Sequence, residues 1–222
     1  MNHNISKYEL IILDIVVLGG FPVNLLVSPN LQEIANKKIG LELSGSQLIQ
    51  ILEKMVNNGD IVFVYFIEDC RENFFIPSVD QIRDALYQIS SPPQLSVHYI
   101  LTQQGGEKWE NYVKPNWDLY IYSSRLNHKM TFRATSKRII DERIHYLLYL
   151  DHCVIDINSL AWNEIKPWDA TYWKTLPRGM EAVFNYSFVQ KINKKVFLDW
   201  DKMSISAWDW YHRTSNWYDR IE

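Results

Sequence analysis

The sequence predicts an α+β protein with two domains, residues 1–122 and residues 123–222. In both halves, β-branched and aromatic runs alternate with segments whose apolar residues recur at helical spacing. The length of 222 residues, with 47% hydrophobic and 22% charged residues, is that of an ordinary globular protein that can bury a core. Helices and strands mixed in this way favour antiparallel sheets covered by helices.

Three helices are predicted before the first strand. Ser6 is a suitable N-cap for the first helix, and Gly19 is a suitable stop. The third helix begins near Ser44 or Ser46, and its apolar residues are spaced i, i+4, i+7 and i+8, which gives one buried stripe. The predicted ranges are 6–19, 31–38 and 44–58, and the stripe consists of Leu48, Leu52, Met55 and Val56.

Two strands with a long insert between them follow. Residues 61–67 are β-branched and aromatic throughout, which predicts a strand buried on both faces. The insert 68–94 contains a helix that starts at a capping box of Ser78 and Gln81. Residues 95–101 alternate with period two, and Thr102 is an N-cap for a helix that ends at Pro115.

Residues 31–113 resemble a winged helix-turn-helix in element order and in the strand-to-helix exit Leu101-Thr102-x-x-Gly105. The resemblance implies that the third helix could enter the major groove of DNA. Its exposed side chains would then read bases, and two lysines of the preceding helix would contact phosphates. The candidate DNA-binding residues are Gln47, Gln50, Lys54, Asn57, Lys37 and Lys38.

The charge of the first half disfavours this DNA-binding interpretation. Residues 1–122 contain 8 Lys+Arg and 14 Asp+Glu, a net charge of −6, whereas residues 123–222 carry +3. Phosphate contacts supply most of the affinity for DNA and require basic side chains. Lys54 is the only basic residue between 44 and 67, and Glu68, Asp69 and Glu72 occupy the approach to the wing. We therefore expect a scaffold or a protein-docking module rather than a DNA reader.

The second half predicts a small antiparallel α+β domain in the order strand, helix, strand, strand. The strand over 129–135 and the helix over 136–150 are followed by strands over 157–165 and 180–189. Between the last two strands lies the segment Trp168-Asp-Ala-Thr-Tyr-Trp-Lys-Thr-Leu-Pro-Arg-Gly179, which is distinctive but matches no motif of known chemistry.

No motif in the chain predicts a catalytic residue, a metal or a cofactor. His145, His152 and Cys153 are the closest approach to a metal cluster, but they lack the spacing and the fourth ligand of a zinc site. Cys153 has no flanking motif of a cysteine nucleophile. Gly105-Gly106 is not part of a phosphate-binding loop, and its position in the first turn of a helix predicts close packing against a strand.

Seven of the nine tryptophans fall within residues 162–222. Large aromatic side chains of this kind either fill a core or form a binding surface. Core packing is the favoured interpretation, and the best candidates for an exposed partner-binding surface are Trp208, Trp210, Trp217 and the neighbouring Asp209. The same residues suit a carbohydrate- or small-ligand-binding protein, or an enzyme, if carboxylates converge on them.

Together these patterns predict a non-enzymatic protein-interaction module in a regulatory or inhibitory role, for example the neutralisation of a toxin. The two cysteines indicate a cytoplasmic chain with reduced thiols. We expect no secretory signal, and no membrane span, because Asp14, Gly19-Gly20 and Pro22 interrupt the apolar stretch 10–27. A DNA-binding transcriptional regulator is the first alternative, and the aromatic ligand site is the second.

Overall fold

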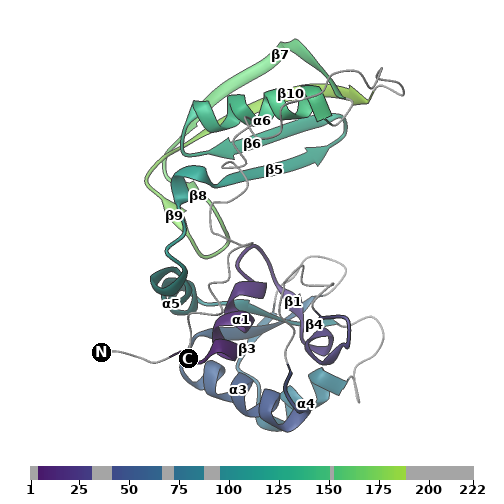
Figure 1. Cartoon of the computed structure of the whole chain (residues 1–222), viewed down its shortest axis with the longest axis vertical. Coiled ribbons are helices and arrows are strands. Elements are labelled where there is room, and N and C mark those ends of the chain that lie inside the picture. The colour runs from purple at the N-terminus through teal and green to yellow at the C-terminus, as the bar shows by residue number, and fades with distance from the viewer. Residues whose placement is uncertain (1–4, 32–41, 67–72, 88–95, 151–152, 189–222) are drawn as a thin grey trace. The chain divides into compact units, whose positions relative to one another are not determined.

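A computed structural model describes residues 5–31, 42–66, 73–87, 96–150 and 153–188. These residues form two compact units. The first contains the described residues up to Lys114 together with Thr171–Lys174, and the second contains Pro115–Ala170 and residues 175–188. Both units combine helices with antiparallel strands, so the predicted α+β class is confirmed (Figure 1). The sequence placed the division at 122, whereas the compact units divide after Lys114 and again at 171–174.

The first unit is a four-stranded antiparallel sheet with helices packed on it. The strand order is β1-β4-β2-β3, and β4 pairs with β2 along its whole length from Ile61↔Leu101 to Phe66↔Ser96. The helices are α1 (Lys7–Ile15), η1 (Val23–Val27), α3 (Gly45–Asn57), α4 (Val79–Tyr87) and α5 (Gln103–Val113). The strands are β1 (Phe21–Pro22), β2 (Ile61–Phe66), β3 (Asn73–Phe75) and β4 (Ser96–Leu101).

Side-chain caps start the helices of this unit where the sequence predicted them. Ser6 and Ser44 each accept a hydrogen bond from the third residue of their helix, and the side chain of that residue bonds back to the cap. Ser78 and Gln81 form the same reciprocal pair at the start of α4. A cap of this kind typically contributes about 1 kcal/mol. The predicted helix over 31–38 lies largely outside the described residues.

The core of the first unit is the predicted stripe of α3 together with α1 and the central strands. Residues Leu48, Leu52, Met55 and Val56 are all buried, as the helical spacing predicted. On the strands, Phe63 and Tyr99 lie opposite each other and are fully buried.

Helix α1 ends at Ile15 rather than at the predicted Gly19. The Val16 N–H bonds to the Leu13 carbonyl in a tighter turn. The carbonyls of Val16 and Val17 then accept hydrogen bonds from the side chains of Tyr172 and Trp173. The glycine signal was therefore overridden by contacts from a distant part of the chain.

The junction of β4 and α5 depends on a close approach to the start of β2. Thr102 caps α5 by accepting the Gly105 N–H, and its hydroxyl donates to the Gly59 carbonyl. A Cβ on Gly105 would overlap the Asp60 carbonyl oxygen. The predicted packing role of this glycine is confirmed.

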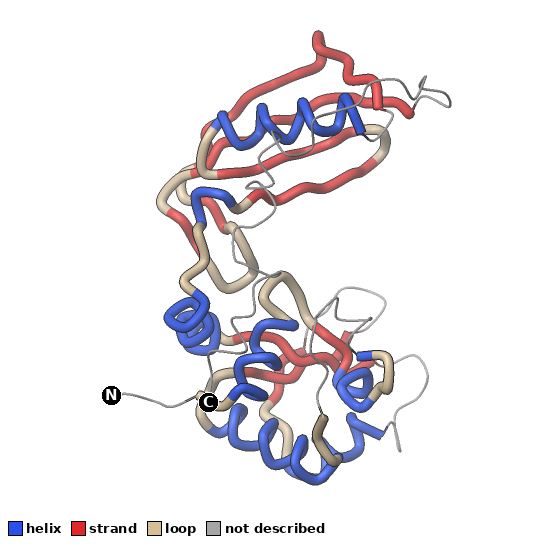
Figure 2. Tube along the Cα trace, in the orientation of Figure 1, coloured by secondary structure: helices blue, strands red, loops and turns tan. Residues whose placement is uncertain are grey.

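The second unit is a four-stranded antiparallel sheet in the order β5-β6-β10-β7, with α6 across one face (Figure 2). Apolar residues of the sheet and of α6 form its core, including Phe132, Ile140, Leu147 and Phe184. The elements are η2 (Trp117–Leu119), β5 (Ile121–Leu126), β6 (Lys129–Ala134), α6 (Lys137–Leu150), β7 (Cys153–Ile165), β8 (Trp168–Asp169), β9 (Thr175–Leu176) and β10 (Gly179–Phe188).

The predicted order of this unit was incomplete because β5 was missed. Strands β5 and β6 form a hairpin whose turn residues, Asn127 and His128, both have positive φ. Such a turn suits a two-residue hairpin loop, but glycine usually marks it in a sequence. The side chains of β5 are mostly exposed or half-buried, so the strand has no clear apolar alternation.

Among the described helices, none combines the length and the apolar character needed to cross a membrane.

Replacing Gly105 with alanine should destabilise the first unit by about 1–3 kcal/mol, because the new methyl group overlaps a backbone oxygen that cannot move freely. Urea unfolding would measure the change. Gly19→Ala is the matched control, because a Cβ there meets nothing within 4 Å, and it should change the free energy of unfolding by about 0.5 kcal/mol or less. Equal effects of the two substitutions would contradict the packing role.

Candidate functional site

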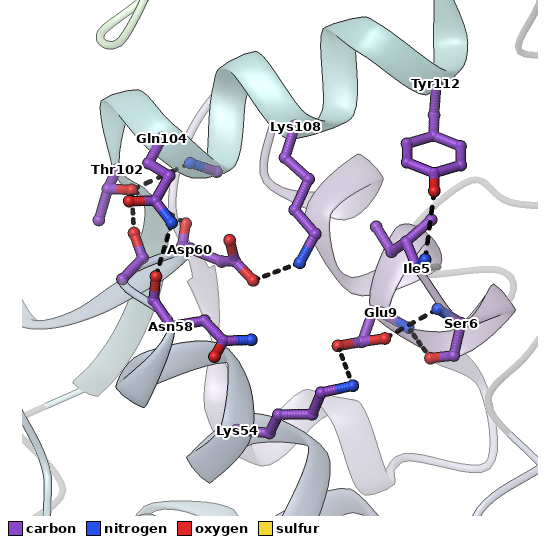
Figure 3. Close-up of polar contacts among 12 residues, drawn as sticks. Ile5, Ser6, Glu9, Lys54, Asn58, Asp60, Thr102, Gln104, Lys108 and Tyr112 are labelled. Carbon is purple, nitrogen blue, oxygen red and sulfur yellow. Dashed lines mark hydrogen bonds and ion pairs between the residues drawn. The ribbon is translucent and has the colours of Figure 1, made fainter. Parts of the chain in front are cut away.

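Three carboxylates are buried in the first unit, and each binds a partner. Glu9, Asp14 and Asp60 are 2%, 2% and 1% exposed. A buried carboxylate without a partner would cost several kcal/mol, so the partner of each group matters for stability. Figure 3 shows the carboxylates of Glu9 and Asp60, which lie between α1, α3 and α5.

Glu9 binds both its own helix cap and a lysine of α3. Its side chain accepts the Ser6 N–H at 2.8 Å, and Lys54 Nζ lies 3.0 Å from its other oxygen (Figure 3). Burial alone raises the pKa of Glu9, but hydrogen bonds from Ser6 and Lys54 and the charge of Lys54 outweigh it. The net result is a pKa below the ordinary value of 4.5, so Glu9 is ionised at neutral pH.

Asp60 joins the start of β2 to α5. Lys108 Nζ lies 2.6 Å from its carboxylate, and the Asp60 carbonyl accepts the Thr102 N–H at 3.1 Å (Figure 3). Beside this pair, the Gln104 side chain donates to the Asn58 carbonyl at 2.7 Å. These contacts fix α5 against the end of α3.

The candidate DNA-binding residues of α3 share one exposed face. Gln47, Gln50, Lys54 and Asn57 follow the spacing i, i+3, i+7 and i+10, and all four are exposed. The Gln47 side chain is engaged in the cap of the helix, and Lys54 is paired with Glu9. Lys37 and Lys38 lie outside the described residues.

A tetrapeptide from the distinctive segment 168–179 belongs to the first unit. The Tyr172 hydroxyl donates to the Val16 carbonyl at 2.6 Å and accepts the Leu101 N–H at 2.8 Å. Trp173 Nε1 donates to the Val17 carbonyl at 3.0 Å, and Lys174 Nζ forms two short contacts with the Glu110 carboxylate, at 2.8 and 2.7 Å. Every side chain of Tyr172–Lys174 therefore has a specific partner.

Trp173 fills a slot that a missing side chain creates. A Cβ on Gly106 would overlap the Trp173 ring, and the ring of Trp109 meets it edge-on with centroids 6.0 Å apart. Trp109 is itself held by a 2.9 Å hydrogen bond from its Nε1 to Asp14. The sequence predicted that Gly105-Gly106 packs closely against a strand, but the close neighbour of Gly106 is the Trp173 ring, and no local pattern connects these two residues.

Two tyrosine hydroxyls, that of Tyr99 and that of Tyr172 in this segment, donate hydrogen bonds to backbone carbonyls of the first unit. The Tyr99 hydroxyl donates to the Ile12 carbonyl at 3.2 Å. Burial, with smaller contributions from Tyr172 and Asp14, raises the pKa of Tyr99 well above 10.0. Burial likewise raises the pKa of Tyr172, and the hydrogen bond from Leu101 offsets only part of that rise. Both hydroxyls are therefore neutral donors at neutral pH.

The remaining candidates divide between structural roles and undescribed positions. Trp168 and Trp173 are buried, which confirms core packing for these two tryptophans, whereas Trp208, Asp209, Trp210 and Trp217 lie outside the described residues. His145 is exposed and lies 2.7 Å from the Asp141 carbonyl of its own helix. Within the described part of the chain, no three His, Cys, Asp or Glu residues gather in a way that could hold a metal ion.

Breaking the Lys54–Glu9 pair should move acid unfolding to higher pH. A carboxylate with a lowered pKa stabilises the fold above its unfolded pKa, and this contribution is lost as pH falls through the folded pKa. Lys54→Met removes two of the causes that lower the pKa of Glu9, so the loss should begin at higher pH. At neutral pH the cost should be only about 1 kcal/mol or less, because the Lys54 side chain is mostly exposed to water.

Circular dichroism during acid titration measures this shift. The control is Arg83→Met, which breaks an exposed pair with Asp80 and should leave the acid midpoint unchanged. An unchanged midpoint in Lys54→Met would show that Glu9 does not depend on the lysine.

Alkaline pH should destabilise the first unit through Tyr99 and Tyr172. Their folded pKa values are raised, so the unfolded chain releases these protons first, from about pH 10 upward, and the free energy of unfolding falls. In urea titrations between neutral pH and pH 11, Tyr172→Phe should be less stable at neutral pH but should lose less stability as pH rises. Phe74→Leu, which removes no ionisable group, should keep the slope of the unsubstituted chain. Equal slopes in all three chains would contradict the role of Tyr172.

Comparison with known proteins adds no relative of this chain. No family model, no curated protein and no solved structure matches it. The interpretation of the site therefore depends on the contacts of its own residues: two ion pairs that use buried carboxylates, an exposed face on α3 with three amides and Lys54, and the bound segment Tyr172–Lys174.

Proposed function

We propose that this chain is a non-enzymatic protein-interaction protein, and that strand β3 of the first unit is a surface to which a partner polypeptide adds. The observation that carries the proposal is an apolar strand at the edge of the described sheet. A regulatory or inhibitory role in the cytoplasm remains part of the proposal and rests on the sequence alone.

Among the described strands, none pairs with the outer side of β3, and apolar side chains in and directly after β3 are exposed to solvent. It is the last of the four described strands and pairs with β2 through three residues. Phe74 on β3 is 55% exposed, and Ile76 directly after it is 78% exposed. An exposed edge with large apolar side chains favours pairing with another polypeptide, a mode in which backbone hydrogen bonds supply affinity.

Aromatic packing holds this edge in place. The ring of Phe75 stacks on Tyr65 with centroids 4.4 Å apart and meets Phe63 edge-on at 6.0 Å. Because Phe75 anchors the strand, Phe74 can remain exposed on a fixed backbone. Fixing a binding strand in advance lowers the entropy lost when a partner binds.

The charges of the first unit support a protein partner over DNA. Its described residues contain six Lys or Arg and nine Asp or Glu. Four of the six bases lie in ion pairs with carboxylates: Lys54 with Glu9, Arg83 with Asp80, Lys108 with Asp60, and Lys174 with Glu110. Phosphates would have to compete with these carboxylates for the cations.

DNA binding is the second candidate function, and one observation favours it. Gln47, Gln50 and Asn57 are exposed on one face of α3, and Gln or Asn can pair with adenine edges in the major groove. The order of α3 followed by the antiparallel pair β2 and β4 supports the winged-helix resemblance, which stays a proposal.

Anisotropy titration of a labelled DNA duplex separates the two functions. We expect only non-specific binding, with Kd weaker than about 10⁻⁶ M at physiological salt. Sequence-selective binding near 10⁻⁸ M that is lost in both Gln50→Ala and Asn57→Ala would establish DNA reading instead. Glu53→Ala, on the same helix, serves as the control for general effects on charge.

Charged substitutions on β3 test the proposed edge directly. In cross-linking and co-purification with the tagged full chain, Phe74→Glu combined with Ile76→Glu should lose partners that the unsubstituted chain retains. Both side chains are exposed, so thermal unfolding should change little. Ile157→Glu replaces a 64% exposed side chain of the second unit and should retain the partners. Identical partner sets in all three chains would rule out β3 as the interface.

A further inference from the structure

We infer that the first unit contains a recognition site for a peptide of two adjacent aromatic residues followed by a cation, a site that Tyr172-Trp173-Lys174 of the chain itself occupies. A partner protein carrying a Tyr-Trp-Lys or Tyr-Trp-Arg segment would compete for it. This site shares no residue with the edge strand β3, so each proposal can fail without the other.

The first position of the site selects a phenol. The Tyr172 hydroxyl is bonded on both sides, because it accepts the Leu101 N–H from the end of β4 and donates to the Val16 carbonyl after α1. Phenylalanine would leave a backbone donor and a backbone acceptor without this partner. An unmade hydrogen bond to a buried group weakens binding by about tenfold or more.

The second position selects an indole. Gly106 has no side chain where the Trp173 ring lies, and Trp109 closes the slot edge-on. The Val17 carbonyl accepts the indole N–H at 3.0 Å. Phenylalanine could enter the slot but has no donor for this carbonyl, so the site distinguishes the two aromatic residues chemically.

The third position selects a positive charge. Both carboxylate oxygens of Glu110 lie within 2.8 Å of Lys174 Nζ. Arginine could contact the same two oxygens through its planar fork. A glutamate in this position would face the Glu110 carboxylate, and like charges at this separation repel.

Although the Trp173 ring is packed in the core, two features of the segment favour its exchange with a competing peptide. Tyr172 is 44% exposed although its hydroxyl is bonded, so the ring lies at the surface of the first unit. The segment also forms its own turn, in which the Thr171 N–H bonds to the Lys174 carbonyl and the Thr171 hydroxyl accepts the Lys174 N–H. A short preformed turn at a surface is a unit that a competing peptide can reproduce.

The receiving groups lie in or directly after elements that have their own caps or strand pairing, although the turn after α1 also accepts hydrogen bonds from the segment. The Val16 and Val17 carbonyls follow α1, which starts at a complete capping box, and the Leu101 N–H ends a strand paired along its length with β2. Gly106, Trp109 and Glu110 all lie on α5, which Thr102 caps. Removing the aromatic side chains of the segment should therefore open the site.

The test uses the full chain with Tyr172→Ala and Trp173→Ala. A labelled peptide with the sequence of residues 169–176 is titrated into this variant and followed by fluorescence anisotropy. We expect saturable binding to the variant and at least about tenfold weaker binding to the unsubstituted chain, whose site is occupied. Absence of binding to a folded variant would overturn the proposal.

Altered peptides test the selectivity of each position. Replacing the peptide's tryptophan with phenylalanine, or its lysine with glutamate, should each weaken binding by about tenfold. Glu110→Lys in the chain should restore binding of the glutamate peptide and weaken binding of the original. Equal affinity for all peptides would indicate non-specific aromatic adhesion and would overturn the proposal.

Two further measurements cover the other outcomes. If the double variant shows no cooperative unfolding, the Lys174→Glu variant is used in its place. Tighter peptide binding to this variant than to the unsubstituted chain supports the site. No binding of the peptide to this variant overturns the proposal. Sedimentation of the unsubstituted chain over a range of concentrations tests whether a second copy of the chain occupies the site. A dimer that Trp173→Ala abolishes would overturn the assignment to a separate partner.

Discussion

The first unit depends on the contacts that Asp60 makes with α3, with α5 and with the junction between β4 and α5. Its N–H bonds to the Met55 carbonyl at the end of α3, its carbonyl accepts the Thr102 N–H between β4 and α5, and its carboxylate binds Lys108 on α5. Gly105 lets the helix approach that carbonyl. One residue at the start of β2 therefore sets the positions of two helices relative to the sheet, and it can do so because each polar atom it buries has a partner.

The end of α1 is organised in the same way, but its partners come from far along the chain. A helix end leaves backbone carbonyls without partners in the helix. Here the side chains of Tyr172 and Trp173 donate hydrogen bonds to the carbonyls of Val16 and Val17. The indole and the phenol bring large apolar surfaces together with single donors, so they satisfy the carbonyls and exclude water from them at once. This explains why the distinctive segment contains adjacent Tyr and Trp residues.

Local signals made much of the fold predictable, and distant contacts account for the remainder. Ser6, Ser44 and Ser78 bond to residues three positions away, so the sequence shows both partners together. Trp173 and Val17 are separated by 156 residues, and no local pattern connects them. Strand β5 was missed for a different reason, since its exposed side chains need no apolar alternation. The sequence accordingly predicted the exposed face of α3 and close packing at Gly105-Gly106. It did not predict that Trp173 packs against Gly106.

The placement of charge links this architecture to function. The buried carboxylates of Glu9 and Asp60 are each paired with a lysine: Lys54, whose side chain is still mostly exposed to water, and Lys108, whose side chain is largely buried. In both ion pairs a lysine charge is matched by a carboxylate, and phosphates would have to compete with that carboxylate for the lysine. The exposed features of the first unit include the amides of α3 and the apolar side chain of Phe74, and groups of both kinds can contact a polypeptide without phosphate neutralisation. The burial of Glu9 and Asp60 and the placement of Lys54 and Lys108 are therefore one constraint, because each carboxylate inside the first unit is paired with a lysine of another element.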